Sequence, residues 1–344
     1  MAFTRYTDSD IVISTNKVVT STWTNNTNNL TIHQTSSIET SFASATSSGQ
    51  FFINVFNLEP DNNDNAEVQY AVAYGNKVGS GSPDFTNDTG SFGVGASRTI
   101  YNQYRQLVFG DETQNFTFDS HTPDDIYVIN INRSRFKHAL KPGTLNLTLK
   151  NANLAGNKNI QLTDDSVTRT GSAVITNLGR QFNIVSGASG IMSGSILGQI
   201  NQTSSYGLFY PDSGIILLNP DNFGGDLVPD RNVGSNTNTD LNHRKLYDAI
   251  SGSSNFILDS EEKITSQFYF TRAKNNEFNY TTNPSFIDAN GNLNFDSMTD
   301  NPQTFITTVG LYNDAGDLVA VAKLSQPVTK DFTKEALIRV KLDY

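Results

Sequence analysis

The sequence predicts a mainly β protein with a few short helices, a β-rich α+β fold built from antiparallel sheets. Short runs rich in Val, Ile, Phe and Tyr alternate with turns of Gly, Asn and Asp along the chain. Only 17% of the 344 residues are charged, and abundant Asn, Ser and Thr favour turns over helix interiors. The 22 Phe and 13 Tyr residues supply material for a core that a disordered chain would lack.

The chain is expected to divide into three segments. Residues 1–48 form a polar N-terminal arm, because they contain few large apolar side chains. Residues 49–225 form a β-rich main lobe. Residues 226–344 hold one helix and a C-terminal β-meander, which can pack on the same core. Pro220 to Asp240, rich in Asn and Gly, is the best candidate for a linker or long loop.

Each element has a local signal. One helix is expected after Ser97, where apolar residues recur at helical spacing, and a second between the cap Asp240 and the stop Gly252. The five residues Asn313–Asp317 indicate a hairpin connection. Strand-like runs occur at 51–58, 67–74, 126–132, 145–149, 180–185, 208–210, 215–218, 305–312, 318–324 and 336–342.

Three apolar residues are spaced along the arm as candidate anchors. Trp23, Leu30 and Ile38 are candidate interface residues, because aromatic and aliphatic anchors dominate interface energetics. Trp23 could equally fill the edge of the chain's own core. If the arm binds a neighbour, deleting residues 1–40 should leave the melting temperature of the isolated protein nearly unchanged and block its assembly.

Charge and composition exclude several classes of protein. The net charge of −10 argues against nucleic acid as the main partner, since phosphate binding needs a basic surface. Cysteine is absent, which excludes disulfides and cysteine-based metal or nucleophile sites. No apolar run reaches ~18 residues and no signal core follows Met1, so neither a signal peptide nor membrane insertion is expected.

Recognised catalytic motifs are missing, so the chain is expected to be no enzyme and to need no cofactor or metal. It contains no phosphate-binding loop, no Gly-x-Ser-x-Gly elbow and no His-Glu-x-x-His. His121 with Asp124 and Asp125 could form a metal or acid–base cluster, but a Pro-Asp turn that leads into a strand at Ile126 is favoured.

Two further acidic patterns have simpler interpretations. Asp164 and Asp165 are adjacent, whereas a glycosidase needs carboxylates from separate segments, so they are interpreted as turn or surface residues. The segments that start at Asp61 and Asp288 imitate a calcium loop, but both lack Gly at position six and Glu at position twelve. Asn290-Gly291 is better explained as a hairpin turn.

Arg133, Lys137 and Lys141 are spaced four residues apart and would form one basic stripe if the segment were helical. A solvated helix face is the favoured interpretation. A docking face for an acidic neighbour is the alternative, and these three residues are therefore also candidate interface residues.

Six segments of the chain match a known pattern, and none of them is a catalytic motif: they are His121–Arg133, Leu162–Val167, Asn177–Val185, Tyr206–Asp212, Phe305–Pro327 and Val340–Tyr344. They resemble virion structural proteins, of tail or baseplate type, from large contractile-tailed phages of marine cyanobacteria. The similarity spans most of the chain and is weakest in the arm; at the C-terminus, Tyr344 stands where Phe is expected.

The resemblance implies a place in the virion tail after synthesis in the host cytoplasm. It implies a structural subunit, in baseplate or tail, that binds other virion proteins in a symmetric multi-copy assembly. The alternative is a host-glycan receptor-binding module, for which Tyr206, Tyr210 and Asp212 are the candidate contacts. A glycan-degrading enzyme is a third hypothesis, but it needs a carboxylate pair that the sequence does not reveal.

Overall fold

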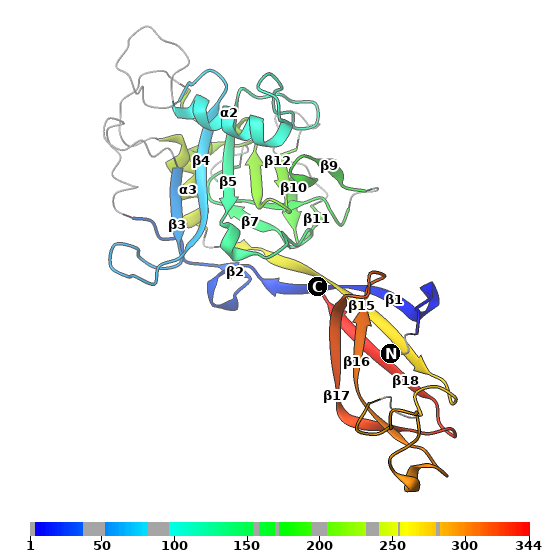
Figure 1. The fold of residues 1–344 in the computed structure, drawn as a ribbon. Coiled ribbons are helices and arrows are strands. Elements are labelled where there is room, and N and C mark those ends of the chain that lie inside the picture. The colour runs from blue at the N-terminus through cyan, green and yellow to red at the C-terminus, as the bar shows by residue number, and fades with distance from the viewer. Residues whose placement is uncertain are drawn as a thin grey trace. The chain divides into compact units, whose positions relative to one another are not determined.

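The computed structural model describes residues 4–36, 52–81, 96–153, 158–168, 172–193, 205–231, 241–253, 255–279 and 283–344. The fold is mainly β with two α-helices in the described residues, as the sequence predicted (Figure 1). The chain divides into two compact units: Val18–Glu262 is one, and Met1–Lys17 with Lys263–Tyr344 is the other. This division differs from the three expected segments.

The unit Val18–Glu262 is built on one large sheet. Its strands follow the order β2-β14-β7-β8-β10-β12-β13-β5-β4-β3, with β9 and β11 also paired to β10. Each pairing in this sheet is antiparallel, as predicted. The strands are β2 (Asn29–Leu30), β3 (Phe52–Phe56), β4 (Val68–Asn76), β5 (Asp125–Ile131), β7 (Asn146–Leu149), β8 (Ile160–Asp164), β9 (Val174–Thr176), β10 (Gly179–Ala188), β11 (Ile191–Met192), β12 (Gly207–Tyr210), β13 (Ile215–Leu218) and β14 (Phe256–Ile257).

Both faces of this sheet are covered. Successive residues of β5 point to opposite faces, so Tyr127 and Ile129 join one apolar core while Ile126 and Val128 join another. Helix α2 (Ala96–Phe109) packs its apolar side into the second core, next to β4 (Figure 1). Helix α3 (Asn242–Ser251) packs into the first. The sheet is therefore buried between two layers, and its central strands are apolar on both faces.

Both predicted helices are present. In α2 the buried residues include Ile100, Tyr101, Tyr104 and Val108, the positions that the helical spacing indicated. Helix α3 ends with Gly252 as its C-cap, as predicted. Its N-cap is Leu241 rather than the predicted Asp240, because the helix begins at Asn242.

The first part of the expected linker is folded instead. It contains the short 3-10 helices η4 (Pro220–Asn222) and η5 (Gly225–Leu227), and Asn222, Phe223 and Leu227 are buried. The abundance of turn residues here reflects tight turns against the core. The linker alternative is wrong for these residues, whereas a long loop, which the sequence also allowed, describes them; the remainder, 232–240, lies outside the described part.

The second unit has two smaller sheets. Strands β1 (Ile11–Ser21), β15 (Asp259–Ala273) and β18 (Ala336–Asp343) form one of them. Strand β6 (Ala139–Leu140) of Val18–Glu262 pairs with Ser260 and Glu261, the first part of β15, which belongs to that same unit. Strands β16 (Thr304–Tyr312) and β17 (Leu318–Lys330) form a hairpin. Its connection is the predicted one: the Asn313 N–H donates to the Asp317 carbonyl at 3.0 Å, and Gly316 adopts φ 86°.

Short 3-10 helices also occur in both units. They are η1 (Asp8–Asp10), η2 (Thr24–Asn26), η3 (Arg133–Arg135) and η6 (Asp296–Met298).

The N-terminal arm is not a free arm where the structure describes it. The Trp23 side chain is 2% exposed, its ring centroid lies 4.9 Å from that of Phe256, and its Nε1–H donates to the Phe256 carbonyl at 2.9 Å. Leu30, in β2, pairs with the same Phe256 in β14. These two side chains fill the chain's own core, so the expectation that they anchor the arm on a neighbour is corrected. Ile38 lies outside the described residues.

Candidate functional site

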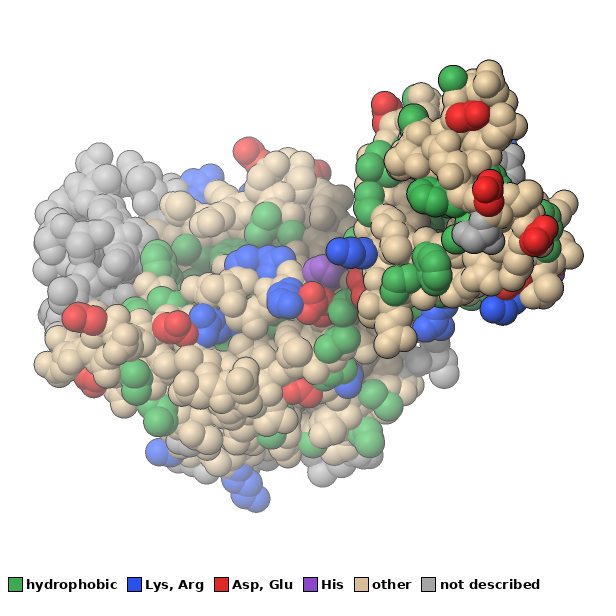
Figure 2. Space-filling view, turned by 60° about the horizontal axis from the view of Figure 1, so that its bottom comes forward, with side chains coloured by type: hydrophobic (Ala, Val, Ile, Leu, Met, Phe, Trp, Pro, Cys, Tyr) green, Lys and Arg blue, Asp and Glu red, His purple; other side chains and the backbone are tan. Residues whose placement is uncertain are grey.

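The outer face of the β16–β17 hairpin carries several large hydrophobic side chains that are exposed to solvent. Val309 and Leu311 point inward and pack in a small core with Val340. Their neighbours along the strands point outward, and there Leu318 is 53%, Val321 58% and Tyr312 40% exposed. Hydrophobic side chains are visible at the surface of this unit in Figure 2. We call Tyr312, Leu318 and Val321 the hairpin patch.

The geometry of the hairpin gathers the patch around one glycine. Gly310 lies directly opposite Val321 in the register, and Tyr312 lies opposite Leu318. A Cβ atom on Gly310 would lie 3.0 Å from the Tyr312 ring and 3.2 Å from Leu318. Since Gly310 has no side chain, these two side chains can approach each other over its backbone. The result is a largely apolar surface that contains no Asp, Glu, Lys or Arg and has the Tyr312 hydroxyl as its polar group.

The sequence analysis did not single out this surface, although it identified both strands. A signal was available in β17, where Leu318-Val-Ala-Val-Ala322 is apolar at every position. Such a run is expected in a strand covered on both faces. In this hairpin one face packs inward through Val309 and Leu311, and the large side chains of the other face are exposed in the described residues.

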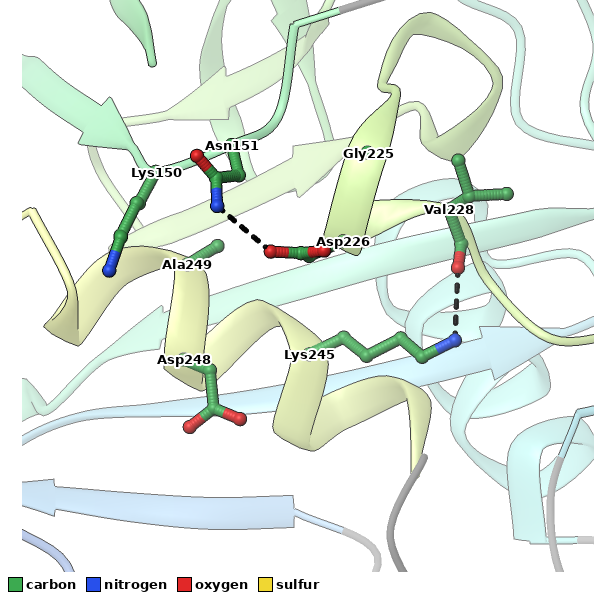
Figure 3. A pocket seen from close by; sticks show the side chains of 8 residues that line it. All are labelled: Lys150, Asn151, Gly225, Asp226, Val228, Lys245, Asp248 and Ala249. Atoms are coloured by element: carbon green, nitrogen blue, oxygen red, sulfur yellow. Dashed lines mark hydrogen bonds between the residues drawn. The ribbon is translucent and has the colours of Figure 1, made fainter. Parts of the chain in front are cut away.

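A polar pocket of about 470 Å³ lies beside α3, in the other unit (Figure 3). The Asn151 amide donates to Asp226 at 3.0 Å, and the Lys245 ammonium donates to the Val228 carbonyl at 3.1 Å. Burial raises the pKa of the Asp248 carboxyl. The pocket offers carboxylates, amines and an amide, a set that can bind the hydroxyl groups of a sugar. It is lined by Lys150, Asn151, Gly225, Asp226, Val228, Lys245, Asp248 and Ala249.

An ionic cluster occupies the region of His121. The His121 Nε2 lies 2.8 Å from Asp221, and Arg231 binds Asp221 at 2.6 Å. Arg231 also binds the buried Asp125 through two nitrogens, at 2.6 and 3.0 Å, and the Tyr74 hydroxyl donates to the same carboxylate at 3.0 Å. Each carboxylate is thus paired with a cation, which suits an ionic connection better than general acid–base chemistry.

The favoured interpretation of the His121 segment is supported by the start of β5. Strand β5 begins at Asp125, so the Pro-Asp turn leads directly into it. His121 binds Asp221, a residue distant in sequence, and pairs through its backbone with Phe118. Among the described residues, no group of three or more His, Asp or Glu side chains is arranged to hold a metal ion.

The adjacent carboxylates serve backbone groups. Asp164 is buried at the end of β8, and both of its oxygens accept the Gly143 N–H, at 2.9 and 3.0 Å. Burial raises the pKa of the Asp164 carboxyl. Asp165 accepts the Asn183 N–H at 2.9 Å. The surface interpretation is therefore wrong for Asp164, because its carboxylate stabilises a turn inside the fold.

The segment that starts at Asp288 forms a turn. Asp288 Oδ1 accepts the N–H groups of Asn290 and Asn292, at 2.9 and 2.7 Å, and Gly291 has φ 86°. The hairpin interpretation of Asn290-Gly291 is confirmed, with Ile287 paired to Leu293. In the segment after Asp61, Asn63 likewise accepts the Asn65 N–H at 3.0 Å.

The predicted basic stripe does not form. Only Arg133–Arg135 is helical, as the single 3-10 turn η3, and the chain is extended from Phe136. The Arg133 guanidinium lies 4.6 Å from the Phe136 ring centroid, and Lys137 pairs with Glu262 at 2.8 Å. Lys141 donates its N–H to the Asp259 carbonyl at 2.8 Å. The three residues therefore share no helix face, because β6 pairs with β15 at this point.

The predicted glycan contacts are also corrected. Tyr206 and Tyr210 are both 0% exposed. Tyr206 directly precedes β12 and Tyr210 is its last residue, and both faces of this strand are covered. Asp212 forms a bidentate pair with Arg180, at 3.0 Å to Nε and 2.7 Å to Nη2. Arg180 also binds Glu261 at 2.8 Å. These three predicted residues are structural and cannot form a sugar-binding surface.

Comparisons of the chain with models of protein families, with curated proteins and with solved structures found no match. Neither helix in the described part of the chain combines the length and apolar character required to cross a membrane.

Proposed function

We propose that this chain is a non-enzymatic structural subunit of a phage contractile tail, placed in the baseplate or associated with the tail. It acts through contacts with other virion proteins, in several copies within a symmetric assembly. It is made in the host cytoplasm and becomes part of the virion.

The hairpin patch is the observation that carries this proposal. Exposed apolar patches on soluble monomers are small, and larger ones mark sites of protein association. Here exposed apolar residues recur through the unit that contains the hairpin, with Val319 at 67% and Leu337 at 67%. A unit of this kind gains stability when a partner covers it. The sequence resemblance to tail and baseplate proteins supports the same function.

The test is the location of the chain in particles of the phage that encodes it. Purified virions are separated into heads and tails, and each fraction is analysed by quantitative mass spectrometry. The chain should be present in the tail fraction in several copies per particle, and a cryo-EM map should contain its density. Absence of the chain from washed particles would contradict the proposal.

A host-glycan receptor-binding module remains the second candidate, now on a different observation. The polar pocket beside α3 presents Asn151, Asp226 and Asp248, whereas the tyrosines proposed from the sequence are buried. A glycan array probed with the purified chain tests this function. Binding that is lost in Asp226→Ala and kept in the Asp314→Ala control, far from the pocket in sequence, would favour it.

A further inference from the structure

The net charge is distributed very unequally between the two units. Val18–Glu262 carries 14 basic and 23 acidic side chains, a net charge of −9. The unit formed by Met1–Lys17 and Lys263–Tyr344 carries ten basic and eleven acidic side chains, a net charge of −1. Two copies of this acidic chain therefore repel each other least where these nearly neutral units meet.

The first strand of the hairpin is free of charged side chains. Strand β16 contains no charged residue, and within the described residues its backbone pairs with β17 alone. Edge strands of monomeric proteins usually carry charges or proline that prevent association. Nothing on β16 opposes the approach of a second protein. In β17 the side chains of Val321 and Lys323 point outward. Val321 lies opposite Gly310 of β16, and Lys323 lies opposite Thr308.

We propose that the hairpin patch is the interface between two copies of this chain, packed face to face across a twofold axis near Val321. The inference names the partner of the structural subunit proposed above and rests on that function. A twofold interface uses the same surface on both copies, so it must be complementary to itself. An apolar patch around Gly310, without a charge at its centre, meets this condition.

The charges at the margin of the patch favour an antiparallel arrangement. Lys323 lies two residues after Val321, and the turn with Asp314 and Asp317 lies on the other side of Val321 along the hairpin. When one hairpin is turned by the twofold axis onto the other, Lys323 of each copy moves toward the acidic turn of its partner. Asp314 lies 3.5 Å from Arg5 of its own chain, and both side chains are almost fully exposed, so a lysine of the partner would compete with Arg5 for this carboxylate.

Analytical ultracentrifugation of the full-length purified chain tests the inference. The wild-type chain should dimerise reversibly with concentration. Val321→Lys places two like charges at the centre of the interface and should weaken dimerisation at least about tenfold. Ile175→Lys is the matched control, since Ile175 is 73% exposed in the other unit, and it should leave dimerisation unchanged. Circular dichroism checks that each variant is folded.

A charge exchange tests the arrangement. Lys323→Glu should weaken dimerisation, and the double variant Lys323→Glu with Asp314→Lys should restore it. A wild-type chain that stays monomeric up to about 0.1 mM, or unchanged dimerisation in Val321→Lys, would overturn the inference. Failure of the double variant to recover would overturn the antiparallel packing. A monomeric chain that is still found in tails would leave the proposed function standing, so the two failures are distinguishable.

Discussion

The two units of this protein reach stability in different ways. In Val18–Glu262 a many-stranded sheet is covered on both faces, and its core includes fully buried tyrosine and phenylalanine side chains. In the other unit only Val309, Leu311 and Val340 are buried in the shared core, while many apolar side chains are exposed. Burial of apolar area is the main favourable term in folding. The second unit therefore has a much smaller apolar core, and burial stabilises it less than it stabilises the first.

The largest effect is expected from removing the N-terminal segment. Deleting residues 1–40 removes Trp23 and Leu30 from the main core and β1 from its sheet. We expect a loss of more than about 5 kcal/mol in the free energy of unfolding, enough to abolish cooperative unfolding. Circular dichroism during urea titration measures this. If the truncated protein unfolds at the same urea concentration as the full chain, residues 1–40 are not part of the core, and the hypothesis that they bind a neighbouring subunit is supported.

A pair of phenylalanine variants compares the two units directly. Phe256→Ala removes a 0% exposed ring that packs against Trp23 and Tyr70, and should cost about 3–5 kcal/mol of unfolding free energy. Phe305→Ala removes a ring that is 60% exposed on β16, and should cost no more than about 0.5 kcal/mol. Urea unfolding of the dilute protein measures both. Equal losses would show that the units do not differ as described.

The core of the larger unit should also respond to pH through His33. Burial lowers the pKa of the His33 imidazole from 6.5 to about 4, and its Nδ1 lies 2.9 Å from the Tyr70 hydroxyl. Between pH 6.5 and 4 the unfolded chain therefore binds more protons, so stability falls as the pH falls, by roughly 3 kcal/mol at pH 4.

Two substitutions isolate this contribution. His33→Asn should reduce the slope of unfolding free energy against pH between pH 6.5 and 4. The control His138→Asn, at an exposed histidine, should leave that slope unchanged. Part of the slope should remain in His33→Asn, because burial also lowers the pKa of His243 to about 4. An unchanged slope in His33→Asn would show that His33 is not the group that titrates.

The smallest effect on stability is expected from two lysines in the unit formed by Met1–Lys17 and Lys263–Tyr344. Lys330 is 0% exposed, and its ammonium donates to the Asn275 carbonyl, Asn279 Oδ1 and the Asp331 carbonyl, at 3.0, 2.6 and 2.9 Å. Lys330→Ala removes all three hydrogen bonds and leaves the buried Asn279 Oδ1 without its lysine donor, so it should cost about 1–3 kcal/mol. The Asn275 and Asp331 carbonyls still accept from Asn279 Nδ2 and the Lys334 N–H. Lys334→Ala removes an ion pair between an exposed lysine and the buried Asp331, whose carboxylate keeps the Thr333 N–H as a donor, and should cost less than about 1 kcal/mol. Thermal unfolding of both variants provides the comparison, and similar melting temperatures would contradict it.

The sequence by itself determined the features that depend on neighbouring residues. The Asn313–Asp317 connection, the Asn290-Gly291 turn and the stop of α3 at Gly252 all follow from local backbone preferences. The alternation of Leu145, Leu147 and Leu149 likewise predicted a strand, and all three leucines are buried. Each signal lies within a few residues of the structure that it specifies.

The tertiary structure alone decided which of these residues are buried and which are free to bind. Trp23 donates to Phe256, 233 positions away, and Arg231 binds Asp125, 106 positions away. Tyr210, a predicted glycan contact, lies within β12, and it cannot contact a glycan because both faces of that strand are covered. Conversely, Leu318, Val319 and Val321 of the apolar run in β17 are exposed, because no other described element covers their side chains. Burial depends on contacts distant in the chain, and no local pattern contains them.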